Sequence, residues 1–400
     1  MNGDNQNIFC NFAFIDNKIK IQMNKTDSYV VVPNACQGKT GVYRKNSAQE
    51  KSHSALTLKK IIRCSVLAIL CSILLLGCNS SNKDNELTLA DASVVWWMGA
   101  GAIAQIDSIY AKNGLKVKTF SMQTGLESKN AVVSGAADIG LTATTPLAME
   151  AFEKEENFIV RLFNKLFRIK EKKLIVLCSY MVSDNLLSLL TPKSDDTTFS
   201  EPTPPIAIVK GTISELYFYN YMATHFPDTD IFNLNQLNVK APDVVNTVKG
   251  GSAKSAVIWE PFATMLSEQV PDLKINRAED CYTHRMYIVT TPEVLAKKRS
   301  AIEKFVKSFE QACDLLNENP TKGKEILKSI FPNNESSMNA LWDKVDFSLK
   351  FDYDKMKELI LKDAEIMYKL KQTPKDEAGN HRQLQLSDIE HYFNHDFKSQ

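Results

Sequence analysis

Two stretches of the chain share one pattern: GAADIGLTATTP runs from Gly135 to Pro146, and GGSAKSAVIWEP runs from Gly250 to Pro261. Each starts with glycine where a helix would end, passes through small residues into a short apolar run, and closes on proline. A short apolar run between chain breakers is typical of a buried strand. Because the unit occurs twice, we predict two lobes, each built around one such strand.

Strands and helices alternate around the first of these stretches. We expect a strand over Glu86–Trp97, a helix stopped by Gly114, and an alternating strand over Leu115–Thr119. A helix over Ser128–Val133 then leads into the strand Asp138–Leu141. This alternation predicts a mainly parallel sheet with helices on both of its faces.

A second α/β lobe follows a change in composition. The segment Thr191–Pro205 is rich in proline, serine and threonine and is interpreted as a connection between the lobes. The second lobe then opens with a strand at Ile206–Val209, and Thr212 and Glu215 have the spacing of a capping box at the start of a helix.

The remainder of the chain is predicted to return to the first lobe. A strand over Arg285–Val289 comes first, and Pro292–Leu370 is helical with a division at Asn319-Pro320. In open α/β sheets ligands bind at the carboxyl ends of the strands, so Thr142–Thr145 and Trp259-Glu260 are expected to face each other across a cleft.

An export signal precedes the lobes. Lys59, Lys60 and Arg63 are followed by an apolar run, Cys64–Leu76, which is shorter than the roughly 20 residues of a spanning helix. The run ends in Leu75-Leu76-Gly77-Cys78, which resembles the lipobox of bacterial lipoproteins. We therefore expect cleavage before Cys78 and a lipid anchor on that residue, which would hold the chain at the cell membrane facing the periplasm or the exterior. An uncleaved anchor or a short buried helix is the alternative.

The residues before this signal carry no predicted function. Since about fifty polar residues precede it, we predict a translation start near Leu56 or Leu58, with Met23 as the alternative. The Gly38-Lys39-Thr40 sequence suggests a P-loop, but Pro33 replaces the leading glycine, so nucleotide binding is not expected.

The predicted division of the chain is 1–55 as an untranslated or disordered extension, 56–77 as the signal peptide, 78–85 as a tether, 86–190 as the first part of lobe 1, 191–281 as lobe 2, and 282–400 as the return to lobe 1 with the C-terminal helices.

Composition excludes several classes of partner. Lys and Arg number 48 and Asp and Glu number 47, a net charge of +1, so the basic surface typical of a nucleic-acid binder is missing.

The eight cysteines form no C-x-x-C pair, and we expect no metal and no cofactor. Cleavage before Cys78 would leave three unlipidated thiols, which allow at most one disulfide or stay buried and free. His391 and His395 have helical ligand spacing but are expected to be surface residues.

Four motifs together carry a resemblance to a known family. They are Gly114-Leu115-x-Val117, Val133–Gly140, Lys210-Gly211-Thr212 and Ala256–Pro261. Over Glu86–Leu370 the chain resembles the lipoprotein and periplasmic solute-binding proteins of ABC importers for nitrate, sulfonates, taurine and thiamine pyrimidine precursors.

The resemblance implies an α/β fold of type II periplasmic binding proteins, with two Rossmann-like lobes, a hinge and a helical C-terminal region. It also implies a monomer that closes over a small-molecule solute and presents it to an ABC permease and its ATPase. The chain departs from the family at Trp96–Ala100, where members have an aromatic residue and a proline-containing turn, and at Glu153–Lys173, a longer charged insertion.

The candidate ligand-binding residues lie at the expected strand ends and helix starts. Aromatic side chains there can form pocket walls, hydroxyl and amide groups can bond solute oxygens, and a helix N-terminus can hold an anion. Core packing, turn formation and helix capping are the alternatives for the same residues. The candidates are Trp96, Trp97, Gln123, Thr124, Thr144, Thr145, Lys210, Gly211, Thr212, Trp259 and Glu260.

Charge gives two opposed expectations for the solute. Lys210 at a helix start favours an anion, whereas a carboxylate at Glu260 would repel a sulfonate or nitrate and would pair with an amine. On that reasoning an aminopyrimidine or taurine is favoured over a bare anion.

Three functions fit the sequence. The leading interpretation is the solute-binding component of an importer, which is not an enzyme and has no catalytic residues. The second is an enzyme of cofactor biosynthesis on the same fold, for which His225 and His284 are the candidates. The third is a sensory or interaction lipoprotein that keeps the cleft without transport.

Overall fold

The computed structural model describes residues 85–152, 173–194, 204–376, 378–393 and 395–397. The predicted lipobox at Cys78, the signal peptide, the P-loop-like segment and nearly all of the charged insertion lie outside these residues. Every described residue belongs to one compact unit.

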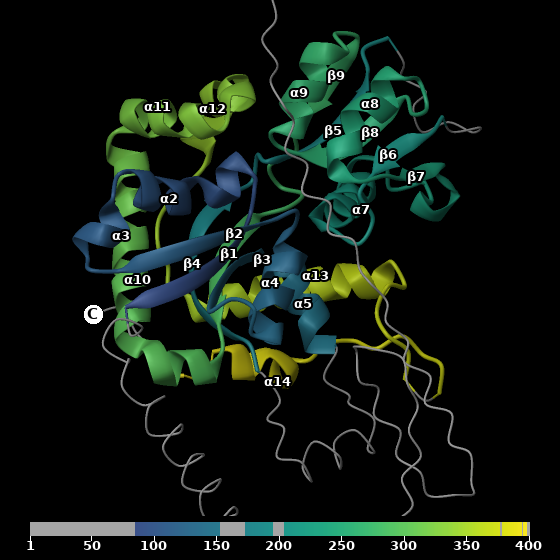
Figure 1. Cartoon of the computed structure of the whole chain (residues 1–400). Coiled ribbons are helices and arrows are strands. Elements are labelled where there is room, and N and C mark those ends of the chain that lie inside the picture. Colours follow the sequence, from purple (N-terminus) through teal and green to yellow (C-terminus); the bar gives the residue numbers. More distant parts are fainter. Residues whose placement is uncertain (1–84, 153–172, 195–203, 377, 394, 398–400) are drawn as a thin grey trace, which may run out of the picture. The chain divides into compact units, whose positions relative to one another are not determined.

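The first sheet has the strand order β2-β1-β3-β10-β4. Its strands β1 to β4 are labelled in Figure 1. Strand β1 pairs in parallel with both β2 and β3, whereas β10 runs antiparallel to β3 and β4. The strands are β1 (Glu86–Ala92), β2 (Lys116–Met122), β3 (Ile139–Ala143), β4 (Ile175–Ser183) and β10 (His284–Thr290).

The second sheet repeats this arrangement with the order β7-β6-β8-β5-β9. Strand β6 pairs in parallel with β7 and β8, and β5 runs antiparallel to β8 and β9. The strands are β5 (Leu187–Pro192), β6 (Ile206–Ile208), β7 (Gln236–Asn238), β8 (Ser255–Trp259) and β9 (Leu273–Asn276). The two glycine-to-proline stretches supply β3 and β8, which occupy the same position in the two orders.

The chain crosses between the sheets twice. Residues 184–186 join β4 to β5, and residues 277–283 join β9 to β10. Ser183 at the end of β4 pairs with His284 at the start of β10, so both crossovers meet the first sheet at one place. This geometry makes β4 and β10 antiparallel, which is why each sheet is mixed and not mainly parallel as expected.

The boundary between the lobes differs from the sequence-based expectation. Thr191 and Pro192 pair with β9 inside the second sheet, so the chain has already crossed before it reaches them. The proline-rich segment therefore belongs to the link between β5 and β6, within one lobe, and its residues 195–203 lie outside the described part. A composition break marks a loop but does not say which elements the loop joins.

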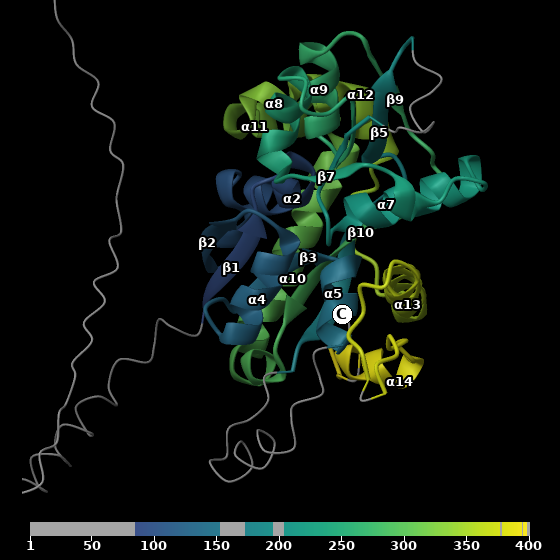
Figure 2. The ribbon, with the colours of Figure 1, turned by 90° about the vertical axis from the view of Figure 1, so that its right-hand side faces the viewer.

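Helices cover both sheets (Figure 2). In the first lobe α4 packs on β1 and β3, α10 packs on α2, and α13 packs on α5. The helices associated with this lobe are α2 (Val95–Ile106), α3 (Ile109–Lys112), α4 (Gly125–Ser134), α5 (Thr144–Phe152), α10 (Pro292–Glu318), α11 (Pro320–Ile330), α12 (Glu335–Leu341), α13 (Tyr353–Lys369) and α14 (Leu386–Ile389).

The second lobe carries α7 (Ile213–His225), α8 (Val244–Lys249) and α9 (Phe262–Gln269). Short 3-10 helices are Ile231–Asn233, Ala241–Asp243, Pro332–Asn334, Trp342–Lys344 and Glu390–Tyr392. Among the described helices, none combines the length and the apolar character that a membrane span requires.

The strand predicted over Glu86–Trp97 is longer than the strand in the structure. Strand β1 ends at Ala92 and α2 begins at Val95, so Trp96 and Trp97 are helical. The first part of α2 is buried almost all round its axis, and such a segment shows no alternation by which a helix could be told from a strand.

Candidate functional site

A pocket with a volume of about 150 Å³ lies between the two sheets. Its walls come from the starts of α2, α4, α5 and α7 and from the ends of β3 and β8. The lining residues are Trp97, Thr124, Gly125, Leu126, Ala143, Thr145, Pro146, Met149, Lys210, Gly211, Thr212, Ile213, Trp259 and Met286. Seven predicted site residues are thus brought together here.

Two tryptophans, one from each lobe, form an aromatic wall. The ring centroids of Trp97 and Trp259 are 5.6 Å apart and the rings are tilted by 36°. The imidazole of His284 stands edge-on to Trp97 at 5.7 Å. Aromatic faces provide a large apolar contact at little conformational cost, so this wall suits the apolar part of a solute.

Helices α4, α5 and α7 begin at the pocket beside α2, and each has eight or more residues. Thr124 caps α4, since its Oγ1 accepts a hydrogen bond from Glu127 N at 3.2 Å, and Thr212 caps α7 by accepting from Ser214 N at 3.3 Å. Helix α5 begins at Thr144 and has no acidic residue in its first turn. The first N–H groups of a helix have no acceptor within the helix and carry partial positive charge.

Nearby carboxylates are held away from the pocket by backbone N–H groups. Glu127 Oε2 accepts from Gln123 N at 2.8 Å, and Glu215 Oε2 accepts from Gly211 N at 2.7 Å. The second bond occupies the Gly211 N–H, so this group is not free for an anion. Lys210 is the one charged residue among those that line the pocket.

Thr145 connects the pocket to a buried acid on α13. Thr145 Oγ1 donates to Asp363 Oδ2 at 2.7 Å, and the hydroxyl of Tyr282 donates to the same oxygen at 2.8 Å. Burial raises the pKa of Asp363 to about 7, and the two hydrogen bonds offset only part of that effect. The proton on this carboxyl therefore controls which hydrogen bonds Thr145 can make.

A second cavity, with a volume of about 610 Å³, adjoins the first through shared lining residues, Thr124 and Trp259. The predicted residue Gln123 lines this cavity and not the smaller one. Lys240 and Glu127 are its charged lining residues.

Two predicted site residues are placed in the core of the first lobe. Trp96 packs against Trp342 and Phe347, with ring centroids 6.1 and 6.4 Å away, and its Nε1 donates to Ser337 Oγ. The Oγ1 atom of Thr144 lies 3.3 Å from the hydroxyl oxygen of Tyr287, in a buried hydrogen bond. Trp96 takes the packing role because successive residues on a helix point in different directions.

Glu260 is also not a pocket wall, which corrects the expectation that it faces a solute. Its buried carboxylate forms an ion pair with Arg277 and accepts hydrogen bonds from Thr264 N at 3.2 Å and from Ser337 Oγ at 3.1 Å. A carboxylate with these partners has its charge compensated inside the protein. Glu260 therefore gives no reason to expect an amine-bearing solute.

Sequence reasoning missed Asp363 and the apolar lining residues. Asp363 follows Met356 and Ile360 and precedes Met367 on the buried face of α13. A carboxyl group on an apolar helical face is a signal that could have been read from the sequence. The spacing could not show that this face packs against α5 at the pocket.

Within the described part of the chain, His284 has no hydrogen-bonding partner at the predicted strand ends. Burial lowers the pKa of His284 to about 3, so its imidazole is neutral at physiological pH, and neither ring nitrogen has a hydrogen-bond partner among the described residues. His395 bonds the carbonyl oxygen of Val176 at 2.8 Å and is half-buried, unlike the surface residue expected. The three described cysteines, Cys178, Cys281 and Cys313, are free and buried.

Comparison with solved structures identifies the fold. The aliphatic sulphonate binding protein of Escherichia coli matches with a TM-score of 0.60 and 12% identity, covering 77% of this chain and 97% of its own. The alkanesulfonate-binding protein of Xanthomonas axonopodis pv. citri, bound to MOPS, matches at 0.58 and 11%, covering 73% and 95%. A Candida albicans protein of the generic periplasmic binding protein fold matches at 0.54 and 14%, covering 75% and 98%.

Comparison with family models and with curated protein sequences finds no match. At 11–14% identity the structural matches establish the fold. The chain has the two-lobed α/β fold of periplasmic binding proteins, as the resemblance in its sequence implied. The same fold hosts different functions, so function has to be argued from the site.

Proposed function

We propose that this protein is the extracytoplasmic solute-binding component of an ABC importer and that it binds a small organic anion with an apolar group. The observation that carries the proposal is the composition of the pocket between the lobes. Tryptophan, methionine and other apolar side chains form most of its walls, and Lys210 is its one charged lining residue. A pocket of this kind favours a solute with one negatively charged head and an apolar body.

The helix starts at the pocket support an anionic head group. Helix α5 directs its N-terminus at the pocket without an acidic residue in its first turn, and the acids on α4 and α7 bond backbone N–H groups instead. Partial positive charge at helix starts stabilises anions, and the effect is larger where water is excluded. Aliphatic sulfonates have this chemistry, and two proteins of the same fold are named for binding them.

Binding would proceed by closure of the lobes. A solute first contacts one lobe and is then bridged by the other, and the closed arrangement is favoured by the additional contacts. The two crossovers at residues 184–186 and 277–283 are the hinge. A permease and its ATPase would accept the solute, and the predicted lipid on Cys78 would keep the protein at the membrane.

A thermal-shift series on the purified full-length chain tests this function. We expect alkanesulfonates of increasing chain length to raise the melting temperature, since a ligand at about 100 times its Kd stabilises by about 2.7 kcal/mol. Taurine, nitrate, an aminopyrimidine and alkylamines complete the series. Lys210→Met should reduce the shift, whereas Lys274→Met, on an exposed position of β9, should leave it unchanged.

The proposal fails if amines stabilise the chain and no anion does, or if Lys210→Met and Lys274→Met behave alike. Conversion of the solute to a product, followed by mass spectrometry of the mixture, would support the enzyme interpretation instead.

A further inference from the structure

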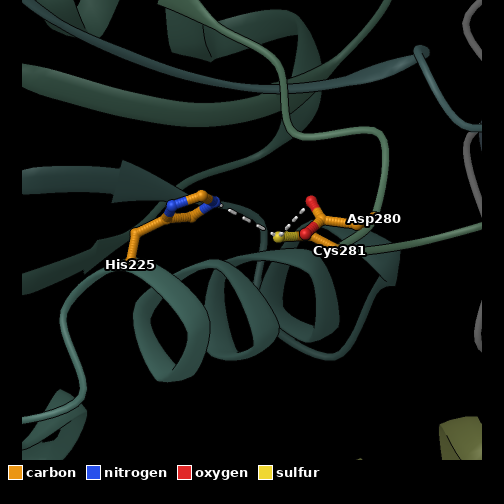
Figure 3. Close-up of side chains that lie close together, drawn as sticks. All are labelled: His225, Asp280 and Cys281. Carbon is orange, nitrogen blue, oxygen red and sulfur yellow. Dashed lines mark hydrogen bonds between the residues drawn. The ribbon is translucent and has the colours of Figure 1, made fainter.

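Three chemically different ligand groups converge on the surface of the second lobe, away from the residues that line the pocket. His225 is the last residue of α7, and Asp280 and Cys281 lie on the crossover from β9 to β10 (Figure 3). The Cys281 Sγ atom lies 3.8 Å from His225 Nε2 and 3.8 Å from Asp280 Oδ1. All three ligand atoms lie within 4.8 Å of one another.

The geometry points to a binding site for a zinc ion, held by His225, Asp280 and Cys281. Thiolate, imidazole and carboxylate are the ligands that zinc takes in proteins, at bond lengths of about 2.0–2.3 Å. In a tetrahedral site these bond lengths place neighbouring ligand atoms roughly 3.5 Å apart. The two separations from Cys281 Sγ, 3.8 Å each, are close to this value, and the third is at most 4.8 Å. Side-chain rotations would therefore complete the site and leave a fourth position for water.

Surrounding contacts fix the ligands in place. Asn220 Nδ2 donates to the carbonyl oxygen of Cys281 at 2.8 Å, which holds the backbone of the crossover against α7. The ring of Tyr221 lies 4.5 Å from that of His225, centroid to centroid, and limits its orientation. Such supporting contacts keep metal ligands in position before the metal binds.

A cysteine–histidine catalytic pair is the other chemistry that these residues suggest. A nucleophilic cysteine needs a lowered pKa, but burial and the charge of Asp280 raise the pKa of Cys281 to about 11. An adjacent carboxylate opposes a free thiolate and favours a divalent cation. Zinc would replace the thiol proton, which is released to the solvent as the sulfur–zinc bond forms, and no oxidant or reductant is required.

A metal ion bound by these three residues would restrain one of the two crossovers between the sheets. Cys281 and Asp280 belong to one of the two links between the sheets, whereas His225 belongs to a helix of the second lobe. A bound ion would tie this link to α7 and shorten the part of the crossover that can bend.

Metal titration of the full-length chain tests the site. After chelator treatment and dialysis, cobalt(II) is added as a spectroscopic substitute for zinc, and the thiolate-to-cobalt absorption band is followed. Because the chain has eight cysteines, the informative quantity is the difference between the wild type and Cys281→Ser. We expect one equivalent of cobalt to give the band in the wild type, zinc to remove it by competition, and Cys281→Ser to lack it.

Two further variants complete the experiment. His225→Ala, at an exposed position, should weaken cobalt binding at least about tenfold, since even loss of a supporting contact costs that much. Asp272→Asn, an exposed acid on the same lobe, should bind as the wild type does. The proposal is overturned if the wild type gives no band, or if the wild type, Cys281→Ser and His225→Ala give the same titration. Should Cys281→Ser fail to fold, the comparison of His225→Ala with Asp272→Asn decides the question.

Discussion

Asp91 is a carboxyl group in the core of the first lobe, at 1% exposure. Neither of its oxygens has a well-formed hydrogen bond among the described residues, and burial raises its pKa well above the usual range. Burial therefore favours the protonated form of this carboxyl group in the folded protein.

The raised pKa of Asp91 makes stability depend on pH. The folded state binds the Asp91 proton more tightly than the unfolded chain does. The contribution of this proton to the free energy of unfolding is therefore complete below pH 3.8, the pKa of Asp91 in the unfolded chain. It is lost as the pH rises towards the pKa of Asp91 in the folded protein. Relative to Asp91→Asn, the free energy of unfolding of the wild type should fall by about 1.4 kcal/mol per pH unit in this window. Urea unfolding of both proteins at pH 5, 6 and 7 measures this. Parallel pH profiles would mean that Asp91 is ionised in the fold.

The protonation of Asp363 leads to a second prediction, which concerns the pH dependence of solute affinity. At pH 8 its carboxylate accepts a hydrogen bond from the Thr145 hydroxyl, which then cannot donate to an anion in the pocket. Below its pKa of about 7 the carboxyl is protonated, and the Thr145 hydroxyl becomes available to the solute. Tyr282, Tyr287 and Lys362 are the other titratable groups that face or influence this carboxyl.

We therefore expect a sulfonate to bind more tightly at pH 6 than at pH 8, by about three- to tenfold, the net effect of one typical hydrogen bond. Asp363→Asn should remove this difference. Calorimetric titrations at the two pH values provide the measurement, and an unchanged ratio in Asp363→Asn would show that another group is responsible.

Two consecutive residues of helix α2 have different roles: Trp96 packs in the core, and Trp97 lines the pocket. Trp96 packs against Trp342 and Phe347, whereas Trp97 packs beside Trp259 in the aromatic wall of the pocket. Trp96→Phe should lower the free energy of unfolding by about 1–3 kcal/mol and leave solute affinity within about twofold. Trp97→Phe should weaken binding about tenfold, because it removes part of an aromatic wall. Chemical unfolding and calorimetry on both variants compare the effects, and the assignment is wrong if Trp96→Phe changes affinity as much as Trp97→Phe.

Elements with a clear local signal could be predicted from the sequence. Strand β8, Ser255–Trp259, lies inside the second glycine-to-proline stretch, and α7 begins directly after Thr212, as the capping-box spacing predicted. Glycine, proline and capping residues fix these ends through backbone geometry that depends only on nearby residues.

Features that depend on distant parts of the chain could not be predicted in this way. The sequence does not show that Arg277 and Ser337 satisfy the Glu260 carboxylate, because these partners come from separate elements. It also does not show that β5 joins the second sheet, since β5 pairs with strands that follow much later. Seven of the predicted site residues nevertheless line one pocket, because parallel strands place their carboxyl ends at one edge of a sheet.

At the scale of the whole molecule, a chain of hydrogen bonds joins the two lobes. Trp96 Nε1 donates to Ser337 Oγ, and Ser337 donates to Glu260 Oε2, which belongs to the second lobe. The Ser337–Glu260 bond is the one that joins the lobes, so it stabilises the closed arrangement and not the open one.

Ser337→Ala should therefore weaken solute binding without touching the pocket. We expect a loss of about three- to tenfold, mostly as faster dissociation, because one buried hydrogen bond that favours the closed state is removed. Ser329→Ala, at an exposed position of α11, is the matched control. Stopped-flow measurement of dissociation compares the two, and equal rates would place this hydrogen-bond chain outside the closing motion.

The central claim is that the pocket between the lobes binds a small organic anion with an apolar group. Calorimetric titration of the full-length chain with butanesulfonate and with butylammonium tests it most directly, because the two solutes share the apolar body and differ in the sign of the head group. The account predicts saturable binding of one butanesulfonate per chain, reduced in Lys210→Met, and no binding of butylammonium. Saturable binding of butylammonium together with no binding of butanesulfonate would contradict it.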